Sequence, residues 1–239
     1  MRTPEMDLPP GVEAHFGASA QQVALDLAGT VATFLEGRLL KAERVSLAVS
    51  GGSTPVPFFH ALSLKQLDWG RVDVLLADER WVGETDLASN TRLVKENLLR
   101  NNAAAARYFS LKQKGSTPEE GLDAVKKELA TLTLPLDVLI LGMGNDGHTA
   151  SLFPDAPELA HAMDAQSRNL VAAMTPPSQE QQRITLTYAL MHGARFTALH
   201  LKGNDKLATL KLALSQPDEL FVMPVRGFLK PGLQVFWSP

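Results

Sequence analysis

The sequence contains no cysteine. This absence excludes disulfide bonds, thiolate metal sites and a cysteine nucleophile, and it fits a reducing compartment. No stretch reaches the roughly 18 apolar residues that a membrane-spanning segment needs. Residues 1–5 carry a single Arg and no apolar signal core. We therefore expect a cytoplasmic protein that does not insert into membranes.

A strong excess of charge of one sign is also missing. The chain has 23 Lys and Arg against 26 Asp and Glu, which gives a net charge of −3. Proteins that bind nucleic acid usually carry a basic face, so no nucleic-acid partner is expected. Any anion must instead be held by a local site, which favours a small ligand. With 239 residues, 45% of them hydrophobic, the chain is long enough for one large α/β domain or two small ones.

The motifs of several common enzyme classes are absent. No pair of histidines has the spacing of a zinc helix, so no metal site is predicted. The sequence contains no Gly-x-Ser-x-Gly elbow and therefore gives no support for a serine hydrolase triad. The glycine-rich segment at residues 50–54 lacks the lysine that defines a P-loop. We expect neither a metal nor a cofactor.

Short apolar runs alternate with segments of helical periodicity along the chain. This order is typical of an α/β protein with a mainly parallel sheet and helices on both faces. We expect one domain over residues 1–239, with an extended arm at 1–14 and room for a minor subdomain around 150–195. The predicted strands cover residues 45–49, 72–77, 136–141, 170–174, 196–201 and 233–237. The predicted helices cover residues 19–40, 55–64, 89–99, 117–130 and 205–214.

Four polar clusters follow predicted strands directly. They comprise residues 50–54, 78–80, 142–151 and 202–206. In open α/β sheets, ligands bind beyond the carboxyl ends of the strands. We therefore expect the four clusters to converge at one edge of the sheet and to form a binding site there.

The first cluster reads Ser50-Gly51-Gly52-Ser53-Thr54 and joins a strand to a helix. Its glycines allow close approach of the backbone to a ligand, and the helix start offers unpaired N–H groups with a partial positive charge. These residues fit a phosphate-binding turn. They fit a tight turn with a helix cap equally well.

Asp146 and His148 lie in a segment that formally matches the dinucleotide pattern Gly-x-Gly-x-x-Gly. We reject a dinucleotide site, because Pro154 and Pro157 prevent a long helix there and no clear strand-end acid follows. A histidine beside a carboxylate suits general acid–base catalysis, although a purely structural loop is the alternative. Arg80, Arg183 and Lys206 could each grip an anion or simply lie at the surface.

Five segments, in order along the chain, resemble the 6-phosphogluconolactonase family. The segment Asp146-Gly147-His148-Thr149-Ala150-Ser151-Leu152-Phe153-Pro154 is the most specific, and the resemblance runs from about residue 15 to the C-terminus. The other segments are residues 49–55, 77–82 with 89–90, 183–187 and 203–206.

This resemblance implies hydrolysis of 6-phospho-D-glucono-1,5-lactone in the oxidative pentose phosphate pathway. It also implies a Rossmann-like fold shared with glucosamine-6-phosphate deaminases, and no metal requirement. His148 would be the general base with Asp146 beside it, and Arg80 and Arg183 would contact the substrate, Arg80 at the reacting centre. The loop of Ser50, Gly51, Gly52, Ser53 and Thr54 would hold the phosphate together with Lys206. The expected partner is a small phosphorylated sugar lactone, and the chain is expected to be a monomer or a homodimer.

Two alternatives stay open from the sequence. A deaminase or isomerase of the same fold would carry a Phe-Asn-Glu-Pro segment, whereas this chain has Ser151-Leu152-Phe153-Pro154 without the acid. A sugar-phosphate sensor without catalytic activity would usually carry an effector domain, and no segment of the chain is free to form one.

Overall fold

The computed structural model describes residues 6–239, and its centre is a seven-stranded sheet. The strand order is β1-β10-β9-β6-β2-β3-β5, and every neighbouring pair is parallel. The mainly parallel α/β architecture predicted from the sequence is confirmed. The strands are β1 (Glu13–Phe16), β2 (Val45–Val49), β3 (Val72–Leu76), β5 (Arg107–Phe109), β6 (Val138–Leu141), β9 (Phe196–Lys202) and β10 (Leu233–Ser238).

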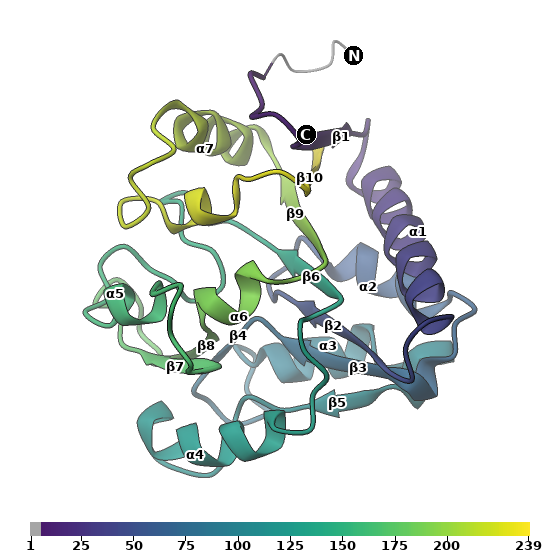
Figure 1. The fold of residues 1–239 in the computed structure, drawn as a ribbon, viewed down its shortest axis with the longest axis horizontal. Coiled ribbons are helices and arrows are strands. Elements are labelled where there is room, and N and C mark those ends of the chain that lie inside the picture. Colours follow the sequence, from purple (N-terminus) through teal and green to yellow (C-terminus); the bar gives the residue numbers. More distant parts are fainter. Residues whose placement is uncertain (1–5) are drawn as a thin grey trace.

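Helices cover both sides of the row of strands. The helices α1 and α2 pack against each other on one side, and α6 and α7 lie on the other (Figure 1). The five predicted helices are present as α1 (Ala20–Leu39), α2 (Val56–Ser63), α3 (Asn90–Asn97), α4 (Pro118–Leu129) and α7 (Asn204–Ser215). The sequence did not predict the short helices α5 (Leu159–Ala162) and α6 (Tyr188–His192), or the 3-10 turns Trp69–Arg71, Asn101–Ala105 and Pro224–Phe228.

A second, antiparallel sheet stands beside the main one. It has the order β4-β8-β7, with β4 (Asp78–Arg80), β8 (Arg183–Leu186) and β7 (Val171–Met174). Ala77 links the two sheets, since its N–H donates to Val49 in the main sheet and its carbonyl accepts from Leu186 in the small one. The predicted strand at 170–174 exists, but it belongs to this small sheet.

Four strands were not predicted, namely β1, β4, β5 and β8. Each has only three or four residues, so their periodicity is too short to recognise. β1 includes Glu13 and Ala14, so the predicted N-terminal arm ends earlier than residue 14. Residues 1–5 of that arm lie outside the described residues.

Buried ion pairs lie at the amino ends of the strands, away from the carboxyl edge. Asp73 on β3 is 1% exposed and accepts hydrogen bonds from Arg44 Nε at 3.0 Å and Arg107 Nε at 2.9 Å. Burial acts to raise the pKa of Asp73, but the two arginines outweigh burial and leave that pKa below its ordinary value. Asp137 accepts from Arg38 in the same way, at 2.7 Å. These carboxylates fix the ends of β3 and β6.

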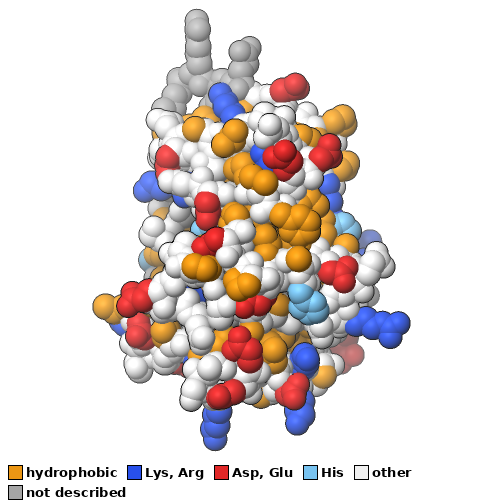
Figure 2. Space-filling model, turned by 90° about the vertical axis from the view of Figure 1, so that its left-hand side faces the viewer, with side chains coloured by type: hydrophobic (Ala, Val, Ile, Leu, Met, Phe, Trp, Pro, Cys, Tyr) orange, Lys and Arg blue, Asp and Glu red, His pale blue; other side chains and the backbone are white. Residues whose placement is uncertain are grey.

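The outer surface mixes apolar and charged side chains. Leu212 on α7 and Phe221 and Val222 after it are more than half exposed. These segments lie on the left of Figure 1, the side that faces the viewer in Figure 2, where hydrophobic side chains stand among charges of both signs. None of the helices within residues 6–239 is both long and apolar enough to cross a membrane.

Candidate active site

A cavity of about 290 Å³ opens at the carboxyl edge of the main sheet. Its volume is close to the lower limit of ligand pockets, roughly 300 Å³, so it suits a small ligand. All four polar clusters that the sequence predicted to converge contribute to its wall. Of the charged residues in that wall, Arg80, Arg183, Lys202 and Lys206 are positive and only Asp78 is negative. The cavity is therefore locally cationic in a chain of net charge −3.

His148 and Asp146 form a hydrogen-bonded pair at the rim of this cavity. Nδ1 of His148 lies 2.6 Å from Oδ1 of Asp146. Burial acts to raise the pKa of Asp146, but the hydrogen bond and the charge of His148 outweigh it and leave that pKa below its ordinary value. An ionised carboxylate only accepts, so Nδ1 carries the ring proton. When the imidazole is neutral, Nε2 is left with a free lone pair, as a general base requires.

The loop that carries this pair is shaped by its glycines. The N–H of Gly144 donates to the carbonyl of His148 at 2.9 Å, and the N–H of Gly147 donates to Gly144 at 3.0 Å. A Cβ on Gly144 would overlap the imidazole of His148 and would come 2.6 Å from Asp146 Oδ1. Gly147 has a φ of +79°, a conformation that favours glycine. The glycines serve the placement of the pair, not a dinucleotide.

The ring of Phe153 supports both His148 and Arg183. The imidazole stacks on it with ring centroids 4.0 Å apart, and the guanidinium of Arg183 lies 5.3 Å from its centroid. Phe153 is 1% exposed, so this platform is fixed by the core. Its role follows from packing and was not predicted from the sequence.

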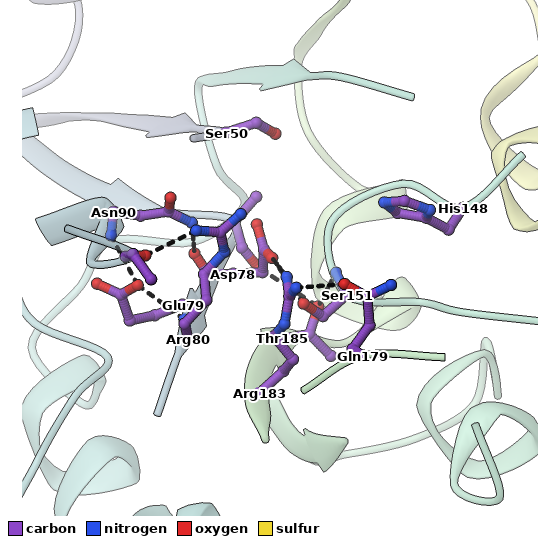
Figure 3. A network of polar contacts seen from close by, with 12 residues as sticks. Ser50, Asp78, Glu79, Arg80, Asn90, His148, Ser151, Gln179, Arg183 and Thr185 are labelled. Atoms are coloured by element: carbon purple, nitrogen blue, oxygen red, sulfur yellow. Dashed lines mark hydrogen bonds and ion pairs between the residues drawn. The ribbon is translucent and has the colours of Figure 1, made fainter. Parts of the chain in front are cut away.

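Arg80 and Arg183 lie side by side on the small sheet. They are direct register partners across β4 and β8, and Figure 3 shows both side chains running from their strands toward the space between Ser50 and His148. Nη1 of Arg80 donates to the carbonyl of Ala88 at 2.7 Å. Like charges directly opposite each other destabilise a strand pair, so this arrangement favours a negatively charged ligand.

Asp78 and Gln179 hold Arg183 in place. Nη2 of Arg183 donates to Gln179 Oε1 at 2.7 Å, and Nη1 lies 3.8 Å from Asp78 Oδ2 (Figure 3). Burial lowers the pKa of Arg183 and Arg80 lowers it further, with Asp78 acting against both. The same Asp78 oxygen accepts from Ser151 Oγ at 2.6 Å. Asp78 and Ser151 belong to two of the clusters predicted to converge, whereas the contact of Gln179 with Arg183 was not predicted.

The triplet 78–80 is divided between two environments. Successive strand residues point to opposite faces, so Asp78 and Arg80 line the cavity whereas Glu79 is fully buried at the start of α3. Burial raises the pKa of Glu79, against hydrogen bonds from the N–H groups of Asn90, Thr91 and Arg80. Glu79 therefore faces away from the cavity and fixes the start of α3.

Asn90 is a wall residue that the sequence analysis did not select as a site residue. It is 3% exposed, and its Nδ2 donates to the carbonyl of Asp78 at 3.2 Å. A Cβ on Gly51 would overlap its amide, so Gly51 is required for close packing of the two segments. The available signal was that residues 89–90, together with residues 77–82, form one of the segments that resemble the family.

The loop of residues 50–54 approaches the cavity mainly through its backbone. The hydroxyl of Ser50 donates to Ile140 at 3.1 Å and accepts from the N–H of Gly142 at 3.3 Å, so its proton is already used to join β2 to β6. Gly52 has a φ of +90°, and together with Gly51 and Thr54 it lines the cavity. Ser53 is exposed and does not line the cavity.

Lys206 reaches the cavity from the first turn of α7. Its Nζ donates to Asn145 Oδ1 at 2.5 Å, which links α7 to the loop that carries His148. Lys202, at the end of β9, lines the same wall. Within residues 6–239, no three His, Asp or Glu side chains gather in a cluster that could hold a metal ion.

Residues 18–237 match a family model described as glucosamine-6-phosphate isomerases/6-phosphogluconolactonase. The chain belongs to this family. The 6-phosphogluconolactonase of Pseudomonas aeruginosa is 46% identical over 239 residues, which cover all of both chains. A crystal structure of a 6-phosphogluconolactonase from Shewanella baltica superposes with a TM-score of 0.93 at 38% identity, covering 98% of this chain and 100% of that one.

Deaminases share the fold of this family. A monomeric glucosamine-6-phosphate deaminase matches with a TM-score of 0.77 at 14% identity, covering 95% of this chain and 97% of that one, which shows the fold alone. In the present chain the segment after the Gly-His step is built of Ser151, Leu152 and Phe153, which are all buried. Ser151 binds Asp78 and Phe153 supports His148, and none of these three residues is an acid.

Proposed function

We propose that this chain hydrolyses 6-phospho-D-glucono-1,5-lactone to 6-phosphogluconate, the second step of the oxidative pentose phosphate pathway. One observation carries the proposal: a histidine whose Nδ1 lies 2.6 Å from a carboxylate oxygen stands at the rim of a cavity whose charged residues are mostly cations. The enzyme would act in the cytoplasm, as a monomer or homodimer, without a metal or a cofactor.

The phosphoryl group would anchor the substrate at the far end of the cavity from His148. The backbone of Gly51, Gly52 and Thr54 at the start of α2 offers N–H groups to an anion, and Lys206 adds a positive charge. Binding energy from this remote group positions the reacting carbon. The hydroxyl of Ser50 would not donate to the phosphoryl group, because it already donates to Ile140.

His148 would act as the general base and then as the general acid. Its Nε2 accepts a proton from water while the water oxygen bonds to C1 of the lactone. The imidazolium then returns that proton to the ring oxygen O5 as the C1–O5 bond breaks. The product acid ionises and releases one proton to solvent. General acid–base catalysis of this kind typically accelerates a reaction by about 10²–10⁴-fold.

The negative charge that develops on the carbonyl oxygen needs stabilisation. Arg80 and Arg183 lie on the wall beside the pair, and a fixed cation aimed at such an oxygen acts strongly in a cavity with little water. Loop N–H groups are the alternative donors.

The test is proton release, at low buffer concentration, from the lactone freshly prepared from glucose 6-phosphate. We expect acceleration over spontaneous hydrolysis that is proportional to protein concentration and insensitive to EDTA. Ammonia release from glucosamine 6-phosphate is followed in parallel. If the lactone is not hydrolysed faster and ammonia is released, the deaminase alternative is correct and the proposed activity is wrong.

A further inference from the structure

A second histidine lines the cavity and has no role in the mechanism above. We propose that His200, as a neutral imidazole, donates a hydrogen bond from Nε2 to the phosphoryl group of the ligand. The identity of this anion rests on the proposed function, whereas the donor itself is argued from the surroundings of His200. His200 lies on β9, two residues before the end of the strand, and is 5% exposed.

Away from the cavity, the ring of His200 packs against apolar side chains. The edge of the ring meets Phe58 of α2, with centroids 6.2 Å apart, and Phe236 of β10 is its register partner. Both phenylalanines are buried. Burial lowers the pKa of His200 to about 4, so the ring is uncharged near neutral pH.

The position of the ring proton follows from these surroundings. Nδ1 of His200 is buried and has no hydrogen-bond partner among the described residues. A buried N–H without an acceptor is rarer in proteins than an unused lone pair. The proton therefore belongs on Nε2. Since the ring forms part of the cavity wall and Nδ1 is sealed, we infer that the Nε2–H edge faces the cavity.

The location of His200 indicates which part of a ligand it meets. Phe58, which contacts the ring, lies in the first turn of α2 just after the loop of residues 50–54. Two residues further along β9, Lys202 also lines the cavity, and Lys206 follows in α7. His200 thus shares the cavity wall with the glycine loop that precedes α2 and with the two lysines, and it packs against the first turn of α2. A neutral donor there binds an anionic oxygen without adding repulsion to the lysines.

The chain offers a matched control in His15. Phe236 lies between His200 on β9 and His15 on β1, and the ring of His15 stacks on it with centroids 4.4 Å apart. Nε2 of His15 is also buried without a partner in the described part of the chain. His15 is the register partner of Phe236 on β1 and does not line the cavity. His15 is only partly buried, but His15→Leu still reports the effect of replacing an imidazole that stacks on Phe236 away from the cavity.

The test compares wild type, His200→Leu, His200→Gln and His15→Leu. Calorimetric titration gives the Kd for 6-phosphogluconate and for orthophosphate, and thermal unfolding gives Tm. We expect His200→Leu to weaken both ligands by at least about tenfold, as for loss of a hydrogen bond to a charged group. Its Tm should stay equal or rise, because an apolar group replaces an unpaired buried nitrogen. His200→Gln, which keeps a donor at similar reach, should recover most of the affinity, and His15→Leu should leave Kd unchanged.

An unchanged Kd in His200→Leu overturns the inference. So does a parallel loss of affinity and Tm that His200→Gln does not relieve, because that result indicates a structural role. If wild type binds orthophosphate with this dependence on His200 but does not hydrolyse the lactone, only the proposed function fails. If wild type binds neither ligand, both proposals fail.

Discussion

Arg80 and Arg183 lie directly opposite each other across β4 and β8, and both line the cavity. Two positive charges in register oppose strand pairing. The charge of Asp78, 3.8 Å from Nη1 of Arg183, relieves this repulsion only in part. Side chains kept against local stability are typical of functional sites, and an anionic ligand would provide the missing compensation.

Removing one charge of this pair should separate binding from stability. We expect Arg80→Gln to weaken 6-phosphogluconate binding by about tenfold or more, since a hydrogen bond to a charged group contributes roughly 1.5–3 kcal/mol. Tm should not fall, because the repulsion is removed. Calorimetric Kd and thermal unfolding measure the two quantities, with the exposed Arg100 changed to Gln as the control. A lower Tm with unchanged Kd would show that Arg80 is structural.

Gly144 offers a way to disturb the pair of His148 and Asp146 without changing either member. A Cβ at this position would overlap His148 and approach Asp146, so the two side chains must separate in Gly144→Ala. We expect kcat to fall to near the level of a variant that lacks the base. The control is Gly37→Ala on the exposed side of α1, where a Cβ meets nothing within 4 Å. That change should leave kcat unaltered and add about 0.5–1 kcal/mol of stability. Wild-type kcat in Gly144→Ala would contradict the assigned geometry.

Asp146 is expected to fix the tautomer of His148. In Asp146→Asn the amide can present either its oxygen or its nitrogen to Nδ1, so the Nδ1–H form is no longer favoured. We expect kcat to fall at least about tenfold, but by less than the roughly 10²–10⁴-fold that loss of the base would cause. Nitrogen-15 NMR of the imidazole should show a protonated Nδ1 in wild type and a tautomer mixture in the variant. An unchanged tautomer with unchanged kcat would exclude this role.

Asp73 should contribute stability that depends on pH. Its folded-state pKa is lowered by Arg107 and Arg44 despite burial, so the contribution is present above the unfolded value of about 3.9 and is lost as pH falls through the folded value. Asp73→Asn should lower the free energy of unfolding at pH 7 by about 3 kcal/mol, the lower end for breaking a buried pair, because both arginines keep partial exposure.

Urea unfolding at pH 7 and below pH 4 measures the difference in free energy of unfolding between wild type and Asp73→Asn. This difference should be smaller below pH 4. As the control, Asp123→Asn at an exposed position should leave the free energy of unfolding unchanged at either pH. A difference that grows as the pH falls would have the wrong sign for a depressed pKa.

The long apolar strands and the helices were predictable because each carries its own periodic or continuous pattern. The convergence of the four polar clusters also followed, since parallel strands bring their carboxyl ends to one edge. The short strands β4 and β8 were not predictable, because three or four residues show no periodicity. Their pairing alone makes neighbours of Arg80 and Arg183, which lie 103 positions apart in the chain (183 − 80).

Contacts between distant side chains account for the rest of the site. Phe153 under His148, Gln179 against Arg183 and Asn90 against Gly51 each depend on packing between elements. His200 reads as one residue of an apolar strand. Only the burial of its Nδ1 and the position of the cavity distinguish it.

The central claim is that His148 is the base that activates water, and its most direct test is kcat for the lactone in His148→Ala. We predict a fall of about 10²–10⁴-fold, with the Kd for 6-phosphogluconate nearly unchanged, because the anchor lies elsewhere in the cavity. His161→Ala, at an exposed position on α5, should behave as wild type. A kcat close to wild type in His148→Ala would contradict the account.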